Sequence, residues 1–212
     1  MILYIYFFIF FCCVVFSLAQ KIKGINNDYL YIYLTLIFLI DFSVLLFAKF
    51  FKTDITGIYF FSDLTTILFT YLYFVLQFSK ERKILVLTVL CLVFLFLNIA
   101  NWSKKNYEDS WGLISCFYTI FVCLFGFYKI IESSSSSDKK IQDLPFFWYG
   151  TAMLLWCVIF LLRIVPRFYF QNTDKLFMDG VRNFFGVINI ITYCLFFYLL
   201  LKYNKNKRNV VF

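Results

Sequence analysis

Residues 29–50 read YLYIYLTLIFLIDFSVLLFAKF, and this stretch decides the fold. A helix of about 20 predominantly apolar residues crosses the hydrocarbon core of a bilayer, and this segment is long and apolar enough to do so. Asp41 lies within it, where an acidic residue at the helix centre costs roughly 2.5–3.5 kcal/mol on insertion scales. The surrounding Leu, Ile, Phe and Val residues offset that cost. The segment therefore predicts a membrane helix whose aspartate turns away from lipid.

The composition extends this prediction to the whole chain. Of its 212 residues, 63% are hydrophobic, 25% are aromatic and only 15% are charged, which is more apolar surface than a soluble domain of this size can bury. We predict an all-α protein, a polytopic membrane helical bundle with seven transmembrane helices in a single domain. The predicted helices are 2–19, 29–50, 58–78, 84–101, 111–131, 146–164 and 181–201.

The charged residues between the helices predict the orientation. With the N-terminus outside and the C-terminus in the cytoplasm, 12 of the 20 Lys and Arg residues fall on the inner side, as the positive-inside rule favours. The inner side then includes a flexible Ser-rich loop, 132–144, and a basic tail, 202–212. The first helix ends in a sequence that resembles a signal-peptide cleavage site. No basic residue precedes its apolar run, so we expect this helix to be retained.

A polar stripe in the third predicted helix is the clearest signal for a site. Its members recur every three or four residues, so they share one face of an α-helix, and a polar face along the full membrane depth must avoid lipid. The polar stripe consists of Tyr59, Asp63, Thr66, Thr70, Tyr73 and Gln77.

Other predicted helices supply partners for this stripe. We predict a ligand or ion pocket inside the bundle, because ionisable residues within membranes are costly and often functional. The structural alternative is that these groups form interhelical hydrogen bonds, worth about 0.6 kcal/mol each, and that the arginines extend to headgroups. The pocket residues are Asp41, Asp63, Thr66, Thr70, Tyr73, Trp156, Arg163, Arg182 and Asn189.

Several chemistries find no support in the sequence. The chain has no histidine, which excludes His-ligated zinc or haem and Ser–His catalysis. It has no glycine-rich nucleotide-binding motif, and its seven cysteines all lie in apolar segments, where they pack as small hydrophobic residues. We predict no cofactor, no metal site, no catalytic residue and no nucleic-acid partner. The expected partners are membrane lipids and a membrane protein.

The chain resembles a group of small, roughly seven-helix inner-membrane proteins common in Bacteroidota, to which no biochemical activity is assigned. The resemblance rests on Asp41, the polar helix that starts near Asp63, the PFFWYG start of the sixth helix (145–150) and Asn189 in the seventh. It implies a bacterial inner membrane and a bundle of seven helices. Members often have a histidine near the third or seventh helix, which this chain lacks.

The sequence supports three functions. The first is a non-enzymatic membrane protein, a sensor-like or scaffold subunit that binds a lipid, small ligand or partner helix in the polar pocket. The alternative is a proton- or cation-coupled small-molecule transporter that uses Asp41 and Asp63. The second alternative is a lipid-active intramembrane enzyme, similar in size to lysoplasmalogenase-like proteins, with Asp63 as acid/base and Arg163 as anion holder.

Overall fold

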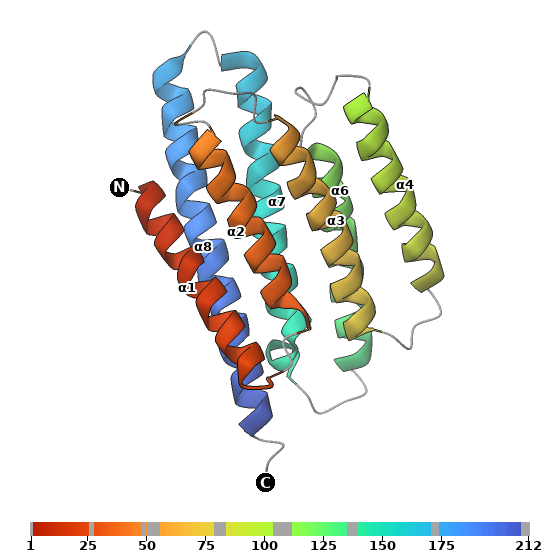
Figure 1. The fold of residues 1–212 in the computed structure, drawn as a ribbon. Coiled ribbons are helices and arrows are strands. Elements are labelled where there is room, and N and C mark those ends of the chain that lie inside the picture. Colours follow the sequence, from red (N-terminus) through yellow and green to blue (C-terminus); the bar gives the residue numbers. More distant parts are fainter. Residues whose placement is uncertain are drawn as a thin grey trace. The chain divides into compact units, whose positions relative to one another are not determined.

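The computed structural model describes residues 2–25, 28–47, 50, 56–78, 84–103, 112–134, 140–170 and 174–208. These ranges contain seven α-helices, a short 3-10 helix and no strand, so the all-α prediction is confirmed. The helices are α1 (Ile2–Ile22), α2 (Leu30–Leu46), α3 (Thr56–Gln77), α4 (Ile84–Ser103), α6 (Leu113–Ser134), η2 (Ile141–Asp143), α7 (Pro145–Phe170) and α8 (Lys175–Arg208) (Figure 1).

Six of the described helices are long and apolar enough to cross a membrane, and α2 is the exception. Its 17 residues rise about 26 Å, slightly less than the hydrocarbon thickness of about 30 Å. The outer faces of the long helices expose large apolar side chains, such as Leu85 and Phe96 on α4. Water disfavours such faces and lipid accepts them, so the chain is a helical membrane protein.

The chain divides into two compact units. The terminal unit comprises Met1–Asn26 and Cys123–Phe212, and the central unit comprises Asn27–Val122. Helix α6 begins in the central unit and ends in the terminal unit.

In the terminal unit, α8 packs against both α1 and α7 (Figure 1). Helix α1 runs parallel to α8: Phe10 stacks on Tyr193 at 3.8 Å, and further along both helices the Gln20 amide donates to the Leu200 carbonyl at 2.6 Å. Helix α7 runs antiparallel to α8, since Trp148 meets Tyr198 and Arg163 meets Phe185. Helices α7 and α8, which follow one another in the chain, therefore run in opposite directions, as consecutive membrane-spanning helices must.

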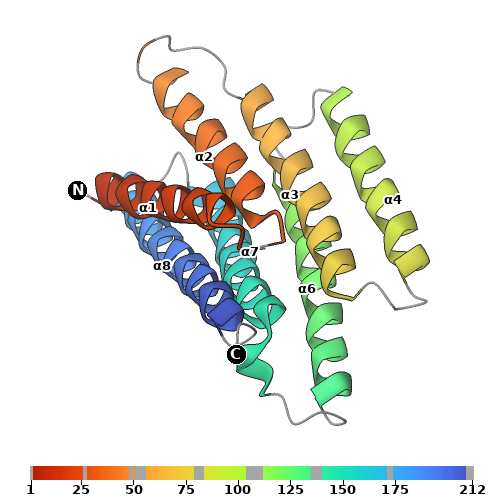
Figure 2. The same ribbon diagram turned by 60° about the horizontal axis from the view of Figure 1, so that its bottom comes forward.

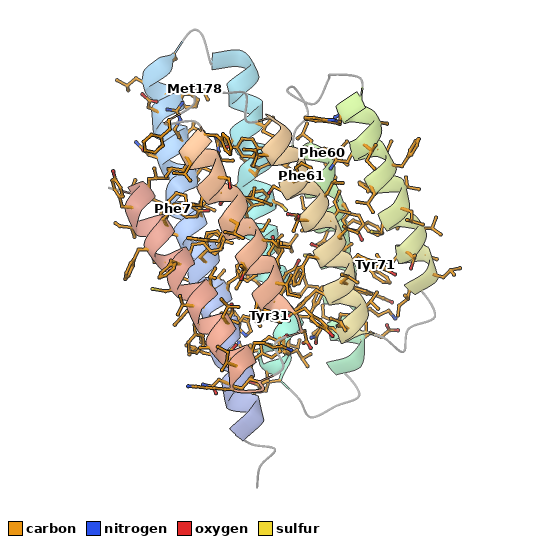
Figure 3. The ribbon with its side chains drawn as sticks, viewed as in Figure 1. Phe7, Tyr31, Phe60, Phe61, Tyr71 and Met178 are labelled. Carbon is orange, nitrogen blue, oxygen red and sulfur yellow. The ribbon has the colours of Figure 1, made fainter. Side chains whose placement is uncertain are left out.

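In the central unit, α3 lies between α2 and α4 (Figures 1 and 2). Tyr33 of α2 stacks on Phe69 of α3 at 4.4 Å. On the other side of α3, the Tyr71 and Thr88 hydroxyls share a hydrogen bond of 2.7 Å, and Figure 3 shows Tyr71 between α3 and α4. Near the opposite end of α4, Trp102 stacks on Phe60 at 4.9 Å, which makes α3 and α4 antiparallel.

Helices α7 and α8 are longer than predicted. Helix α7 continues past the predicted end at 164, through Pro166, to Phe170, because membrane helices tolerate proline where neighbouring groups satisfy the freed carbonyl. Helix α8 begins at Lys175 rather than 181, because the Asp174 carboxylate accepts the Phe177 N–H at 2.9 Å and caps the helix.

The predicted basic tail is also largely helical, since α8 reaches Arg208. Four parts of the predicted segments lie outside the described residues: 48–49 at the end of the second helix, 111 at the start of the fifth, 135–139 in the Ser-rich loop and 209–212 in the tail.

Candidate functional site

The polar stripe lies on the covered face of α3. Four of its residues are buried: Asp63, Thr66, Thr70 and Tyr73; the end residues Tyr59 and Gln77 are half-buried. The opposite face is apolar and exposed, with Phe61, Leu68, Leu72 and Leu76. The spacing of polar residues therefore predicted the orientation of this helix correctly. Whether these residues bind a ligand stays a prediction.

The Asp63 carboxylate holds the start of α6. Its Oδ2 accepts the Gly112 backbone N–H at 2.9 Å and its Oδ1 accepts the Ser115 hydroxyl at 2.8 Å. Gly112 has a φ of 77°, a conformation that residues with a Cβ rarely adopt, and this places its N–H toward Asp63. A carboxylate at a helix N-terminus is stabilised by the helix dipole and by donors that have no partner within the helix. These contacts explain how an acidic side chain only 9% exposed is held here.

Asn98 of α4 lies level with Asp63. The stacking of Trp102 on Phe60 fixes the register between α4 and α3. Asn98 lies one turn before Trp102 on α4, and Asp63 lies about one turn after Phe60 on α3. Because the two helices are antiparallel, the turns that carry Asn98 and Asp63 face each other. Asn98 is 1% exposed, and within the described part of the chain neither its Nδ2 nor its Oδ1 has a hydrogen-bond partner.

Thr119 extends the polar region by one turn of α6. It follows Ser115 by four residues on the same face, is fully buried, and its hydroxyl has no hydrogen-bond partner among the described residues. The Thr66 hydroxyl, by contrast, donates to the Ser62 carbonyl of its own helix at 2.9 Å. We call the buried polar residues of α3, α4 and α6 in this unit the polar seam: Asp63, Thr66, Thr70, Asn98, Ser115 and Thr119.

Asp41 lies at the same depth as Asp63. Helix α2 runs antiparallel to α3, with Asp28 beside Gln77 and Tyr33 against Phe69, so Asp41 is level with residues 61–64. Asp41 is half-buried and continues the covered face of α2 by one turn beyond Ile37. The two aspartates thus occupy neighbouring helices at one level.

Three of the predicted site residues meet in the terminal unit. The Trp156 indole N–H donates to Asn189 Oδ1 at 3.0 Å, across the α7–α8 interface. Two turns along α7, the Arg163 guanidinium lies 4.7 Å from the Phe185 ring centroid. Arg182 does not join this group: its side chain is 72% exposed and pairs with Asp179 of its own helix at 3.1 Å.

The Trp156–Asn189 hydrogen bond gives a test of the α7–α8 interface. We expect Trp156→Phe to lower the free energy of unfolding by about 0.6 kcal/mol, and by at most about 1.7, the range for interhelical bonds in membranes. Thermal unfolding of Trp156→Phe, Asn189→Leu and the double variant in detergent would measure it. If the two losses simply add, the side chains do not interact.

The sequence prediction missed Asn98, Ser115 and Thr119 as site residues, although a signal was present. Ser115 and Thr119 are four residues apart, and Asn98 is an amide within an apolar helix. Among the described residues, no group of three or more His, Cys, Asp or Glu side chains gathers as a metal site would.

The chain matches no family model, no curated protein and no solved structure. The resemblance to the Bacteroidota membrane-protein group therefore stays a prediction, and a function has to be argued from the residues of the chain.

Proposed function

We propose that the protein is a non-enzymatic membrane subunit, sensor-like or scaffold-like, that recognises a lipid or small ligand through the polar seam. The observation that carries this proposal is Asn98, a buried amide level with Asp63 whose donor and acceptor have no partner within the described part of the chain. Buried polar groups nearly always have partners, and leaving one unsatisfied costs about 1–3 kcal/mol.

The contacts of Asp63 favour recognition over the transport alternative. A carboxylate that carries ions has to exchange its partners, whereas Asp63 accepts hydrogen bonds from Gly112 and Ser115 that hold it in place.

The proposal includes a bacterial inner membrane, an N-terminus outside and a C-terminus in the cytoplasm. Helices α1 and α8 run parallel, so if both cross the bilayer the two chain ends lie on opposite sides. The majority of Lys and Arg residues on the inner side supports the direction. Single-cysteine labelling would test it, on a background in which the native cysteines are replaced.

Ligand recognition predicts a specific loss on changing the seam. The protein, extracted into nanodiscs and analysed by native mass spectrometry, should retain a lipid or small molecule that the Asn98→Leu/Thr119→Val variant lacks. The control is Thr88→Val, which removes a hydroxyl from α4 outside the seam. Equal retention by all three proteins would contradict the proposal, and ion flux in proteoliposomes that depends on Asp63 would favour transport instead.

The same amide predicts a gain of stability in the absence of ligand. Asn98→Leu replaces an unsatisfied amide by an apolar group of similar size, so we expect delipidated protein to become more stable by about 1–3 kcal/mol. Thermal unfolding in detergent would measure the change, with Thr88→Val expected to be slightly less stable than wild type because it breaks the bond to Tyr71. A less stable Asn98→Leu protein would mean that the amide has a structural partner.

A further inference from the structure

The hydrogen-bonding capacity of the Asn98 amide limits which chemical groups of a ligand can satisfy it. A primary amide offers donors at Nδ2 and an acceptor at Oδ1, and both are unused among the described residues. A hydroxyl group also carries one donor and lone pairs that accept, so one or two adjacent hydroxyls satisfy both ends of the amide. An ammonium group only donates and a phosphate at neutral pH mainly accepts, so each leaves one end of the amide unsatisfied.

The charge around the seam also disfavours an anionic ligand. Asp41 on α2 and Asp63 on α3 both lie level with Asn98 on α4. A phosphate placed here would meet carboxylates at the same depth, and like charges repel strongly where the dielectric constant is low. A neutral group carries no such cost.

The depth of Asn98 fits the glycerol region of a lipid. Asn98 lies five residues before the end of α4 and Asp63 lies seven residues after the start of α3, which corresponds to about 8–11 Å of helix. A lipid with a small polar group would thus bring that group to the level of the amide.

We propose that the seam binds an uncharged, hydroxyl-bearing group, that of a neutral lipid such as a diacylglycerol or of a free polyol, with Asn98 as the residue that recognises the hydroxyl. This rests on the proposed function and specifies its ligand class. Asn98 donates from Nδ2 to the hydroxyl oxygen and accepts the hydroxyl proton at Oδ1. Thr119, one turn deeper on α6, offers a second buried hydroxyl for a longer ligand.

The test uses the full-length protein in phosphatidylcholine nanodiscs, with added dioleoylglycerol, dioleoylphosphatidic acid or free glycerol. Thermal unfolding and native mass spectrometry should show binding of dioleoylglycerol to wild type and to Thr88→Val, and binding at least about tenfold weaker to Asn98→Leu, equivalent to 1.4 kcal/mol. Asn98→Ser keeps a smaller polar group and should retain part of the affinity. An Asn98-dependent effect of glycerol alone would support the hydroxyl chemistry and identify a free polyol as its source.

Three results would overturn this inference. The first is that dioleoylphosphatidic acid binds as tightly as dioleoylglycerol. The second is that the hydroxyl ligands bind Asn98→Leu as tightly as wild type. The third is that none of these ligands binds, in which case only water would hydrogen-bond the amide. The inference can fail while the proposed function stands: this is the result if the protein retains a ligand that depends on Asn98 but has no hydroxyl group. The absence of any retained ligand that depends on the seam would remove both.

Discussion

The Asp63→Ala variant is expected to unfold at a clearly lower temperature than wild type, with a loss of roughly 1.5–3 kcal/mol for hydrogen bonds to a charged acceptor. The substitution removes the buried acceptor of the Gly112 N–H and leaves the Ser115 hydroxyl with the Gly112 carbonyl alone, at 3.0 Å. It also removes the negative charge from the N-terminus of α6, where such a charge contributes about 0.3–1 kcal/mol. Thermal unfolding in detergent, followed by helical circular dichroism, measures the loss.

Two variants control for this effect. Asp63→Asn keeps the shape and one acceptor oxygen, so its loss should be smaller. Thr65→Ala changes a neighbouring residue whose hydroxyl only donates to the Phe61 carbonyl of its own helix, so it should unfold close to wild type. If Asp63→Ala were as stable as Thr65→Ala, Asp63 would not hold the start of α6, and the transport alternative would regain support.

The periodicity of α3 was readable from the sequence because it depends only on local geometry. Helical spacing places Asp63, Thr66, Thr70 and Tyr73 on one face, and lipid excludes a polar face of that length. The ends of α7 and α8 were harder to predict. The predicted helices end at 164, before Pro166, and begin again at 181, although Asp174 followed by an apolar pattern is a helix-start signal.

The partners of these residues could not be predicted from the sequence. Gly112 and Ser115 lie about 50 residues beyond Asp63, and only the packing of α3, α4 and α6 brings them together. The level of Asn98 with Asp63, by contrast, is predictable from the alternating direction of successive helices, and the stacking of Trp102 on Phe60 agrees with it. The spacing of residues along the chain predicts which of them share a face of one helix. The detailed register between two helices is known only from the contacts between their side chains.

The polar seam combines groups with two different energetic roles. Asp63 and Ser115 are bonded to each other and stabilise the fold, whereas the Asn98 amide and the Thr119 hydroxyl cost stability until something binds them. Satisfied and unsatisfied groups at one level are what a recognition site needs, since the fold holds one part in place and the ligand completes the other. This is why Asp63 and Asn98 variants should change stability in opposite directions in ligand-free protein.

The second large effect is expected at Gly126, where α6 approaches α7 in the terminal unit. A Cβ at this position would overlap the Phe146 ring, which is itself buried at 1% exposure and has little room to move. We expect Gly126→Ala to destabilise the protein by about 1–3 kcal/mol, the usual cost of overpacking a core, even though alanine is the better helix former. Thermal unfolding in detergent would measure it.

Gly180 of α8 provides the matched control, because a Cβ there would meet nothing within 4 Å. Gly180→Ala should leave stability unchanged or raise it by up to about 1 kcal/mol through helix propensity alone. Phe146→Leu should partly restore the Gly126→Ala variant, since a smaller side chain opens the space that the new methyl group needs. If both glycine variants gained stability, α6 and α7 would not approach closely at Gly126, and the packing of the terminal unit described above would be wrong at that contact.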